Sequence, residues 1–186
     1  MIQHIFNLIS AITPYDAQEE EHIQETVNWV KSGVPIFRIQ KPDVPKKHLV
    51  SYFVVFDEKT SKILLVDHKK AGLWLPSGGH VEVNEDPTET LRRECLEELR
   101  IPADFYFNDP FFLTVTQTIG AVVRHTDVSL WYVLKADHQD IYDFDKTEFY
   151  GVQWFDLDEI PYKNSDPHMS RFVGKLKDKI AKKYFS

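Results

Sequence analysis

The sequence has 186 residues, which is the length of one globular domain with room for a small appendage. Hydrophobic residues make up 42% and charged residues 27%, a composition that excludes a disordered or fibrous chain and allows a substantial core. Lys and Arg number 22 against 29 Asp and Glu, and the formal net charge of -7 excludes nucleic acid as an expected partner, because its phosphates carry the same sign.

The single cysteine and the first residues bear on the compartment. Cys95 cannot form a disulfide within the chain, which favours a reducing cytoplasm. The first twelve residues are apolar at helical spacing, but they lack the basic start and the cleavage site of a secretory signal and are shorter than the roughly 20 residues of a membrane span. We expect them to form a helix that docks on the rest of the chain, and we expect no membrane as a partner.

An acidic helix and an extended strap follow. Thr13 and Pro14 suit the cap and the first position of a helix, and residues 17–31 carry apolar side chains at i, i+4 and i+7. Gly33 ends this helix, and three prolines in residues 35–47 predict an extended segment. The main domain is therefore expected to begin where this segment ends.

The pattern becomes strand-like after the strap. Leu49 opens an apolar run that, with a polar turn and a second short run, predicts a β-hairpin. Strands and helices then follow one another irregularly, which predicts an α/β fold with a mixed sheet covered by helices. Strands are expected at residues 49–56, 63–66, 73–75, 111–115, 128–134 and 152–155, and helices at residues 87–99 and from Asp166 and Pro167 onward.

We expect three parts of the chain. Residues 1–47 form a helical arm and strap, residues 48–162 form the main domain, and residues 163–186 form a carboxy-terminal helix packed on it. The apolar faces of the arm also allow another role, as the contact surface of a homodimer.

The stretch from Leu75 to Ile101 is the most informative part of the sequence. Its second half is expected to be helical, and Glu94, Glu97 and Glu98 then fall within one arc of roughly 100°, because they are spaced i, i+3 and i+4. Carboxylate oxygens are the ligands that Mg2+ and Mn2+ prefer, and no Cys or His cluster in the sequence offers a softer site. A lone E-x-x-E-E pattern is more often a solvated acidic face, so the neighbouring residues decide between the two interpretations.

Three neighbouring features favour a metal site over a solvated face. Gly78 and Gly79 allow a tight turn that brings the backbone close to a metal ion or a phosphate. Glu85 follows that turn, and Arg93 stands where it can pair with carboxylates and fix the helix against the loop. Together with the glutamates, these residues predict a site where a helix and a glycine loop meet.

The same residues resemble a known motif, the box of the Nudix hydrolase family. That box reads G-x5-E-x7-R-E-U-x-E-E-x-G-U, where U is a bulky apolar residue. This sequence matches it at Gly79, Glu85, Arg93, Glu94, Cys95, Glu97, Glu98 and Ile101. Arg100 replaces the second glycine. An Arg in the left-handed conformation of that glycine costs roughly 1 to 2 kcal/mol, unless the helix ends differently before Pro102.

The resemblance implies a fold and an activity. The fold is a Nudix-type α/β/α sandwich with a mixed sheet, here with an amino-terminal helical extension. The activity is hydrolysis, dependent on Mg2+ or Mn2+, of a pyrophosphate bond in a nucleotide or another small diphosphate substrate, by attack of water on phosphorus. Bound cations remove the repulsion between the carboxylates and the polyphosphate.

The resemblance also implies roles for single residues. The three helix glutamates are expected to bind the metal with the backbone of Gly78, and Glu97 is expected to act also as the base. Glu85 and Arg93 resemble the family's orienting salt bridge. In the family a further catalytic carboxylate comes from the loop before the last strand, where Glu148 stands. Its rivals on that loop are Asp143 and Asp145.

The substrate is less closely specified. Several residues near the motif or on the strap are candidates to contact phosphate or base, although each is also an ordinary surface residue. They are Gly79, His80, Glu82, Arg38 and Arg124, with Lys70 and His125 as further candidates. The markers of the ADP-ribose, dinucleoside polyphosphate and coenzyme A branches of the family are not evident, which favours a nucleoside triphosphate, such as an 8-oxo-purine nucleotide, or an uncommon substrate.

A second function remains open. A Nudix-like domain can sense a nucleotide without cleaving it, and the amino-terminal helices would then be its output or its dimer contact. The presence of all three helix glutamates favours the enzyme over this alternative.

Overall fold

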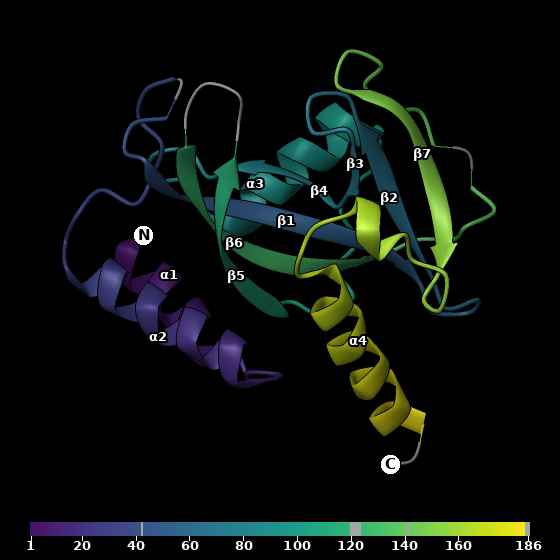
Figure 1. Ribbon diagram of the computed structural model, residues 1–186, viewed down its shortest axis with the longest axis horizontal. Helices are drawn as coiled ribbons and strands as arrows, with labels where there is room; N and C mark the ends of the chain where they lie inside the picture. Colours follow the sequence, from purple (N-terminus) through teal and green to yellow (C-terminus); the bar gives the residue numbers. More distant parts are fainter. Residues whose placement is uncertain (42, 120–123, 141, 185–186) are drawn as a thin grey trace.

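A seven-stranded mixed sheet forms the centre of the molecule, and helices lie on both of its faces (Figure 1). The computed structural model describes residues 1–41, 43–119, 124–140 and 142–184. The strands are β1 (Lys47–Asp57), β2 (Lys62–His68), β3 (Leu73–Leu75), β4 (Ser77–His80), β5 (Phe112–Ile119), β6 (Arg124–Lys135) and β7 (Phe149–Asp156). The helices are α1 (Ile2–Ala11), α2 (Ala17–Lys31), α3 (Pro87–Glu94) and α4 (Met169–Tyr184), with a π-helical turn, η1 (Cys95–Leu99), and a 3-10 turn, η2 (Tyr162–Asn164). None of the helices described is long and apolar enough to cross a membrane.

Strand β1 organises the sheet. It runs parallel to β6, from Lys47 opposite Thr126 to Phe56 opposite Lys135, and antiparallel to β2 and β4. The strand order is β3-β2-β1-β6-β5, with β4 beside β1 and β7 beside β2. A parallel pair among antiparallel pairs makes the sheet mixed, as predicted. β1 thus brings β4 and β6, which are far apart in the sequence, close to each other.

Alternate side chains along the central strands belong to opposite faces of the sheet. In β1, Phe53 and Val55 join the core that includes residues of α1, α2 and α3, whereas Val54 and Phe56 join the core that includes residues of α4. All four side chains are buried. Burial on both faces explains why the strand reads as a continuous apolar run. The predicted α/β/α sandwich with an amino-terminal helical extension is confirmed.

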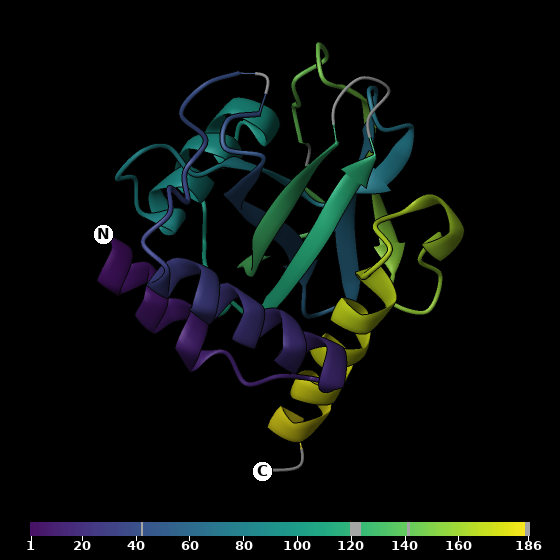
Figure 2. The ribbon, with the colours of Figure 1, turned by 60° about the vertical axis from the view of Figure 1, so that its left-hand side comes forward.

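The helices α1 and α2 lie side by side, α2 packs against β5, and the start of α2 approaches α4 (Figure 2). Their side chains Ile5, Ile9 and Ile23 belong to the same core as the sheet. The first helix therefore docks on its own chain, as expected, and intrachain packing buries most of the apolar side chains of the arm, although Ile2 stays 44% exposed.

Helix α2 spans the predicted residues 17–31, but its cap and the start of α4 differ from the prediction. Asp16, not Thr13, caps α2. Its carboxylate accepts a hydrogen bond at 2.8 Å from the backbone N–H of Glu19, in the first turn of the helix. Pro14 accordingly lies outside the helix. Asp166 forms a separate turn, since its carboxylate accepts the N–H of His168 at 2.7 Å, and α4 starts only after that turn.

Strand β4 was not predicted. Its four residues, Ser-Gly-Gly-His, have low intrinsic strand propensity. They form a strand because β1 offers a paired edge, with Tyr52 opposite Gly78 and Ser51 opposite Gly79. This pairing fixes the glycine loop of the motif to the centre of the sheet.

Candidate active site

The acidic helix of the motif is built in two parts. Asp86 caps α3 through its side chain, and Pro87 occupies the first turn. Residues 87–99 are helical, as predicted, but the α-helix ends at Glu94 and the last turn, η1, is π-helical. A π-helical turn is wider than an α-helical one, and such turns are frequent at functional sites.

Arg100 ends this turn. It adopts the left-handed conformation, with φ 56° and ψ 27°, and its backbone N–H donates to the carbonyl oxygen of Cys95. Its guanidinium also donates to the carbonyl oxygen of Leu96 at 3.1 Å. The chain therefore keeps the geometry of the family's glycine and accepts the strain of a side chain there.

Glu98 lies deepest in the site and is 8% exposed. Its carboxylate accepts hydrogen bonds from the Ser77 hydroxyl and, at 3.1 Å, from the N–H of Gly78. Burial raises the pKa of Glu98 to about 8. At φ 148° only glycine is at ease at position 78, and a Cβ there would collide with Ser51 and Tyr52 of β1. The N–H of Gly78 is thus directed at Glu98 and not at a phosphate.

Glu94 lies against the second glycine of the loop. A Cβ at position 79 would fall on the carboxylate of Glu94, so Gly79 leaves the room that this side chain occupies. The Nη1 of Arg93 donates to Glu94 at 2.5 Å. Burial raises the pKa of Glu94 despite this partner. Each glycine of β4 therefore lies against one glutamate of the motif, Gly78 against Glu98 and Gly79 against Glu94.

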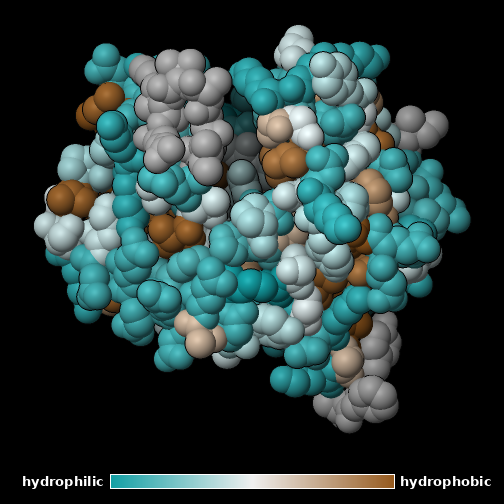
Figure 3. Space-filling view, in the orientation of Figure 1, coloured by the Kyte–Doolittle hydropathy of each residue, from teal (hydrophilic) through white to brown (hydrophobic). Residues whose placement is uncertain are grey.

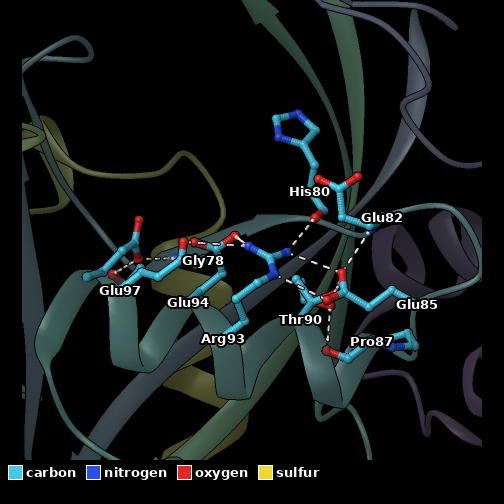
Figure 4. Close-up of polar contacts among 12 residues, drawn as sticks. Gly78, His80, Glu82, Glu85, Pro87, Thr90, Arg93, Glu94 and Glu97 are labelled. Atoms are coloured by element: carbon cyan, nitrogen blue, oxygen red, sulfur yellow. Dashed lines mark hydrogen bonds and ion pairs between the residues drawn. The ribbon is translucent and has the colours of Figure 1, made fainter.

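Arg93 connects the helix to the loop (Figure 4). Figure 4 shows its guanidinium between Glu94 and Glu85, with the carbonyl oxygen of His80 as a further acceptor at 3.4 Å. Two of its nitrogens, Nε and Nη2, each lie 3.2 Å from a carboxylate oxygen of Glu85. Burial alone would raise the pKa of Glu85, but hydrogen bonds from Arg93, the Glu82 N–H and the Thr90 hydroxyl outweigh it and lower that pKa. The predicted salt bridge is present.

Glu97 and Glu148 face the same cavity from the helix and from the loop before β7. The side chain of Glu97 is 60% exposed and lies 3.8 Å from Arg93. Of the two rivals of Glu148, Asp145 also lines the cavity, and its backbone N–H donates to the carbonyl oxygen of Glu98 at 2.8 Å. Asp143 is not among the described residues that line it.

The cavity has a volume of about 850 Å³ and opens between β4, the acidic helix and the loop before β7. Figure 3 shows the surface hollowed at the top of the view, with hydrophilic side chains at the upper right of the hollow. Its described acidic side chains are those of Glu82, Glu94, Glu97, Glu98, Asp127, Asp145 and Glu148. Its described basic side chains are those of Arg38, Lys41, Lys70 and Arg93. A polyphosphate entering this cavity is repelled unless cations neutralise the carboxylates.

The structure brings most of the predicted substrate residues to this cavity, but not all. Arg38 of the strap and Lys70 of the β2–β3 turn line it together with Gly79, His80 and Glu82. The side chain of Arg124 lies outside the described residues. His125 is not among the described lining residues and instead stacks on the ring of His48 at 5.3 Å between centroids.

Sequence reasoning missed a group of residues beside the cavity. His48 and Asp127 sit opposite each other in the parallel pairing of β1 and β6, and the His48 Nε2 lies 3.1 Å from Asp127. Tyr52, His68 and Lys41 also line the cavity. No local motif marks these residues, because their proximity depends on the register between distant strands. The expectation that no His cluster offers a softer metal site was wrong, since His48, His80 and His125 lie together.

The family model described as NUDIX domain matches residues 46–176, more than two thirds of the chain. The chain therefore belongs to the Nudix family. This assignment makes it a hydrolase that acts on acid anhydrides, the class that the box predicts. A comparison with curated proteins gives no match.

Solved structures share the fold at low sequence identity. The E. coli dihydroneopterin triphosphate pyrophosphohydrolase is 17% identical, with a TM-score of 0.51 over 67% of this chain and 94% of its own. The MutT protein from Methanosarcina mazei Go1 is 17% identical, with a TM-score of 0.56 over 70% of this chain and 93% of its own. The NUDIX domain of Shewanella oneidensis NrtR, solved with ADP ribose, is 16% identical, with a TM-score of 0.57 over 71% of this chain and 87% of its own. At these identities the similarity shows the fold alone.

Proposed function

We propose that this protein is a divalent-metal-dependent Nudix hydrolase that cleaves a pyrophosphate bond in a nucleoside diphosphate-linked substrate. The observation that carries the proposal is the position of Glu94, Glu97 and Glu98 on the wall of one cavity of about 850 Å³. Arg38 and Lys70 line the same cavity and supply positive charge for phosphate groups.

The donor set fits Mg2+ or Mn2+. The three helix glutamates offer only carboxylate oxygens, which are the ligands that these hard cations prefer. Glu98 is buried and Glu94 is partly buried, and burial penalises their charged forms, so a cation beside them offsets a cost that the protein otherwise bears. We propose these glutamates as the ligands, with the Gly78 carbonyl as a further one. When bound, the cation neutralises phosphoryl oxygens and makes water more acidic.

The remaining steps belong to side chains of the chain itself. Arg93 holds Glu94 and, through Glu85, keeps the glycine loop on the helix. We propose that Glu97, the most exposed of the three helix glutamates, accepts a proton from the attacking water. The water oxygen then bonds to phosphorus as the bridging P–O bond breaks, and the leaving phosphate keeps the electron pair. Glu148 is proposed as a further catalytic carboxylate.

A nucleoside triphosphate, such as an 8-oxo-purine nucleotide, is the proposed substrate. The cavity volume is in the range of small-molecule sites, roughly 300 to 1,000 Å³. Two structural neighbours support a small nucleotide-like ligand, since one is named for a triphosphate substrate and the other is a complex with ADP ribose. Gly79, His80 and Glu82 are proposed to contact this ligand.

A substrate panel tests the proposal. Nucleoside triphosphates, nucleotide sugars and dinucleotides are incubated with the full chain and Mg2+ or Mn2+, and products are separated by chromatography. We expect release of pyrophosphate or of a nucleoside monophosphate from at least one of them. Turnover that continues in excess chelator would contradict the metal dependence.

The alternative is a domain that senses a nucleotide without cleaving it. Calorimetric binding of a nucleotide without any product in the panel would favour this reading. The presence of Glu94, Glu97 and Glu98 together on the cavity wall favours the hydrolase.

We further propose a reducing cytoplasm as the compartment, because the Cys95 thiol is buried and unpaired. We also retain as a proposal the division of the chain into an arm and strap (residues 1–47), a main domain (residues 48–162) and a carboxy-terminal helix (residues 163–186).

The proposal of a homodimer loses its original motivation, because Ile5, Ile9 and Ile23 are buried within one chain. The mass of the full chain in light scattering tests it.

A further inference from the structure

Three histidines from different strands meet next to the candidate active site. His48 lies near the start of β1, His80 at the end of β4 and His125 near the start of β6. The Nε2 atoms of His48 and His80 are 2.9 Å apart. Asp43 of the strap joins them, and one ligand atom from each of the four residues lies within 4.8 Å of the others.

The hydrogen bonds of His48 determine which of its nitrogens is free to bind a cation. Its Nδ1 lies 2.9 Å from the carbonyl oxygen of Pro45, and a carbonyl only accepts, so this nitrogen carries the hydrogen. In the neutral ring, Nε2 then holds a lone pair, which faces the Nε2 of His80 and the Oδ1 of Asp127 at 3.1 Å. His48 is fully buried. A lone pair facing a carboxylate oxygen in a buried position requires a cation between them, either a proton or a metal ion.

We propose that His48, His80, His125 and Asp43 bind a transition-metal ion of the Zn2+ class, at a second metal site distinct from the helix glutamates. Imidazole nitrogens with one carboxylate suit Zn2+ and exclude a preference for Mg2+. Ligand atoms around a tetrahedral Zn2+ lie roughly 3.3 Å apart. The two Nε2 atoms of His48 and His80 are 2.9 Å apart, and the ligand atoms of the four residues are at most 4.8 Å apart. These distances lie on either side of about 3.3 Å, so small side-chain movements complete the site.

The surroundings of the four ligands support the site. Metal-binding imidazoles almost always donate their second N–H to a carbonyl or a carboxylate, as His48 does to Pro45. Asp127 lies 3.1 Å from the Nε2 of His48 and 3.4 Å from the Nε2 of His125, so its carboxylate places negative charge next to both rings. With Asp43 and Asp127 ionised, a divalent ion is neutralised by its surroundings.

The position of the site gives it a role in the cavity. His80 and Asp127 line the cavity, whereas His48 is buried behind its wall. The bound ion connects the strap with β1, β4 and β6 and holds the His80 end of the glycine loop. It therefore braces the cavity wall next to the glycine loop, which lies against the glutamates that the proposed hydrolysis uses.

A second acidic group serves as an internal comparison. His138, Asp57 and Asp137 also come together, but the His138 Nδ1 and N–H both reach the Oδ2 of Asp57, at 2.7 and 3.1 Å. Asp57 in turn accepts the N–H of Lys59 at 2.8 Å. These bonds account for that group as a capped turn, without an ion.

Metal binding is tested with the full chain, stripped with chelator and dialysed, and with Zn2+ or Co2+ alone. Calorimetry is expected to show one tight Zn2+ per chain, and Co2+ is expected to give the intense visible bands of a tetrahedral nitrogen-rich site. Substituting a residue that only hydrogen-bonds to a metal ligand already lowers metal affinity about 10- to 100-fold. Substituting a direct ligand should cost no less, so His80→Asn and His125→Asn should each weaken Zn2+ binding at least about tenfold. His138→Asn and Glu98→Gln should leave it unchanged.

Two results would overturn the proposal. One is a parent chain that binds no Zn2+ tightly, and the other is an affinity for Zn2+ that is the same in both histidine variants as in the parent chain. The close approach of His48 and His80 would then be a hydrogen bond that shares a proton. The two variants alter partly exposed side chains in separate strands, and circular dichroism reports their folding, so either one decides the question if the other misfolds. The assay contains no substrate and is independent of the proposed hydrolysis.

Discussion

At the residue scale, the candidate active site consists of side chains that hold one another in place. The Glu98 carboxylate accepts a hydrogen bond from the Gly78 N–H, and the Glu94 carboxylate occupies the space that a side chain at Gly79 would take. Arg93 is hydrogen-bonded on both sides, to Glu94 and to Glu85. A change at one of these residues is therefore expected to act on function before it acts on stability.

Glu98→Gln is expected to lower kcat at least about 100-fold, because it removes a proposed metal ligand while keeping the shape of the side chain. The fold should be unaffected or slightly stabilised, since burial penalises the charge that the substitution removes. Steady-state kinetics and thermal melting measure the two effects. Near-normal turnover would remove the metal-site assignment.

Gly79→Ala is expected to lower activity at least about tenfold with little change in Tm. The added Cβ falls on the carboxylate of Glu94, which is the flexible end of a side chain and can move aside, but then leaves its position in the site. Gly151→Ala is the matched control, because a Cβ at that position meets nothing within 4 Å. Equal activity of the two variants would show that the position of Glu94 does not matter.

At the element scale, two helix ends are stabilised or strained by identifiable residues. The turn η1 ends at Arg100 in a left-handed conformation, and α2 is capped by Asp16, which also pairs with Arg171 of α4. Arg100 contacts residues of its own turn, whereas Asp16 pairs with a residue of a distant helix. The contribution of each helix end to the free energy of unfolding can be measured without an activity assay.

Arg100→Gly is expected to stabilise the protein by up to about 1 kcal/mol, because glycine adopts φ 56° without the penalty of a Cβ. Chemical denaturation measures the free energy of unfolding. Arg100→Ala is the control, since it removes the guanidinium contact with Leu96 but keeps the backbone penalty, and it should not stabilise. A destabilised glycine variant would show that the guanidinium contact outweighs the strain.

The pair of Asp16 and Arg171 predicts a pH dependence of stability. Hydrogen bonding to Arg171 lowers the pKa of Asp16 to about 2, below the value of about 4 in an unfolded chain. A lowered folded-state pKa means that the stabilisation is complete above about pH 4 and is lost as the pH falls through 2.

Asp16→Asn isolates this effect, because asparagine still caps α2. The parent chain should be more stable at neutral pH by at most about 1 kcal/mol, since the pair is partly exposed to solvent. The difference in free energy of unfolding should shrink toward zero between pH 4 and pH 2. A difference that stays constant over this range would refute the assigned pairing.

At the scale of the whole molecule, a buried ion pair joins the amino-terminal arm to the carboxy-terminal helix. Glu19 of α2 is fully buried, and Lys175 of α4 donates to both of its oxygens at 2.8 and 3.0 Å. Glu19 also accepts the N–H of Leu113 in β5 at 3.2 Å. One carboxylate thus holds two helices and a strand together.

Lys175→Ala is expected to lower the free energy of unfolding by about 3 kcal/mol, because Glu19 would stay buried without its cation. Lys177→Ala, on the same helix, is the control. Its partner Asp158 is largely exposed, so its loss should cost about 1 kcal/mol or less. Urea denaturation of both variants measures the difference, and equal costs would mean that the arm is not held by this pair.

The sequence by itself determined the family, the α/β fold class, the common cavity wall of Glu94, Glu97 and Glu98, and the salt bridge of Glu85 with Arg93. These features depend on spacing within a short segment, and hydrophobic periodicity reports burial directly. It also anticipated that Arg100 would have to adopt a glycine-like conformation or end the helix in another way. It failed at β4, since a Ser-Gly-Gly-His segment becomes a strand only when a neighbouring edge pairs with it.

Only the tertiary structure decided which distant residues share the cavity. The register of β1 with β6 and β4 places His48 beside Asp127 and near His80, and the packing of the strap adds Asp43 and Arg38. The π-helical turn that directs Glu94 and Glu98 toward different glycines also has no signature in the spacing of the glutamates. Such contacts arise from strand pairing and packing over long sequence separations, which local patterns do not encode.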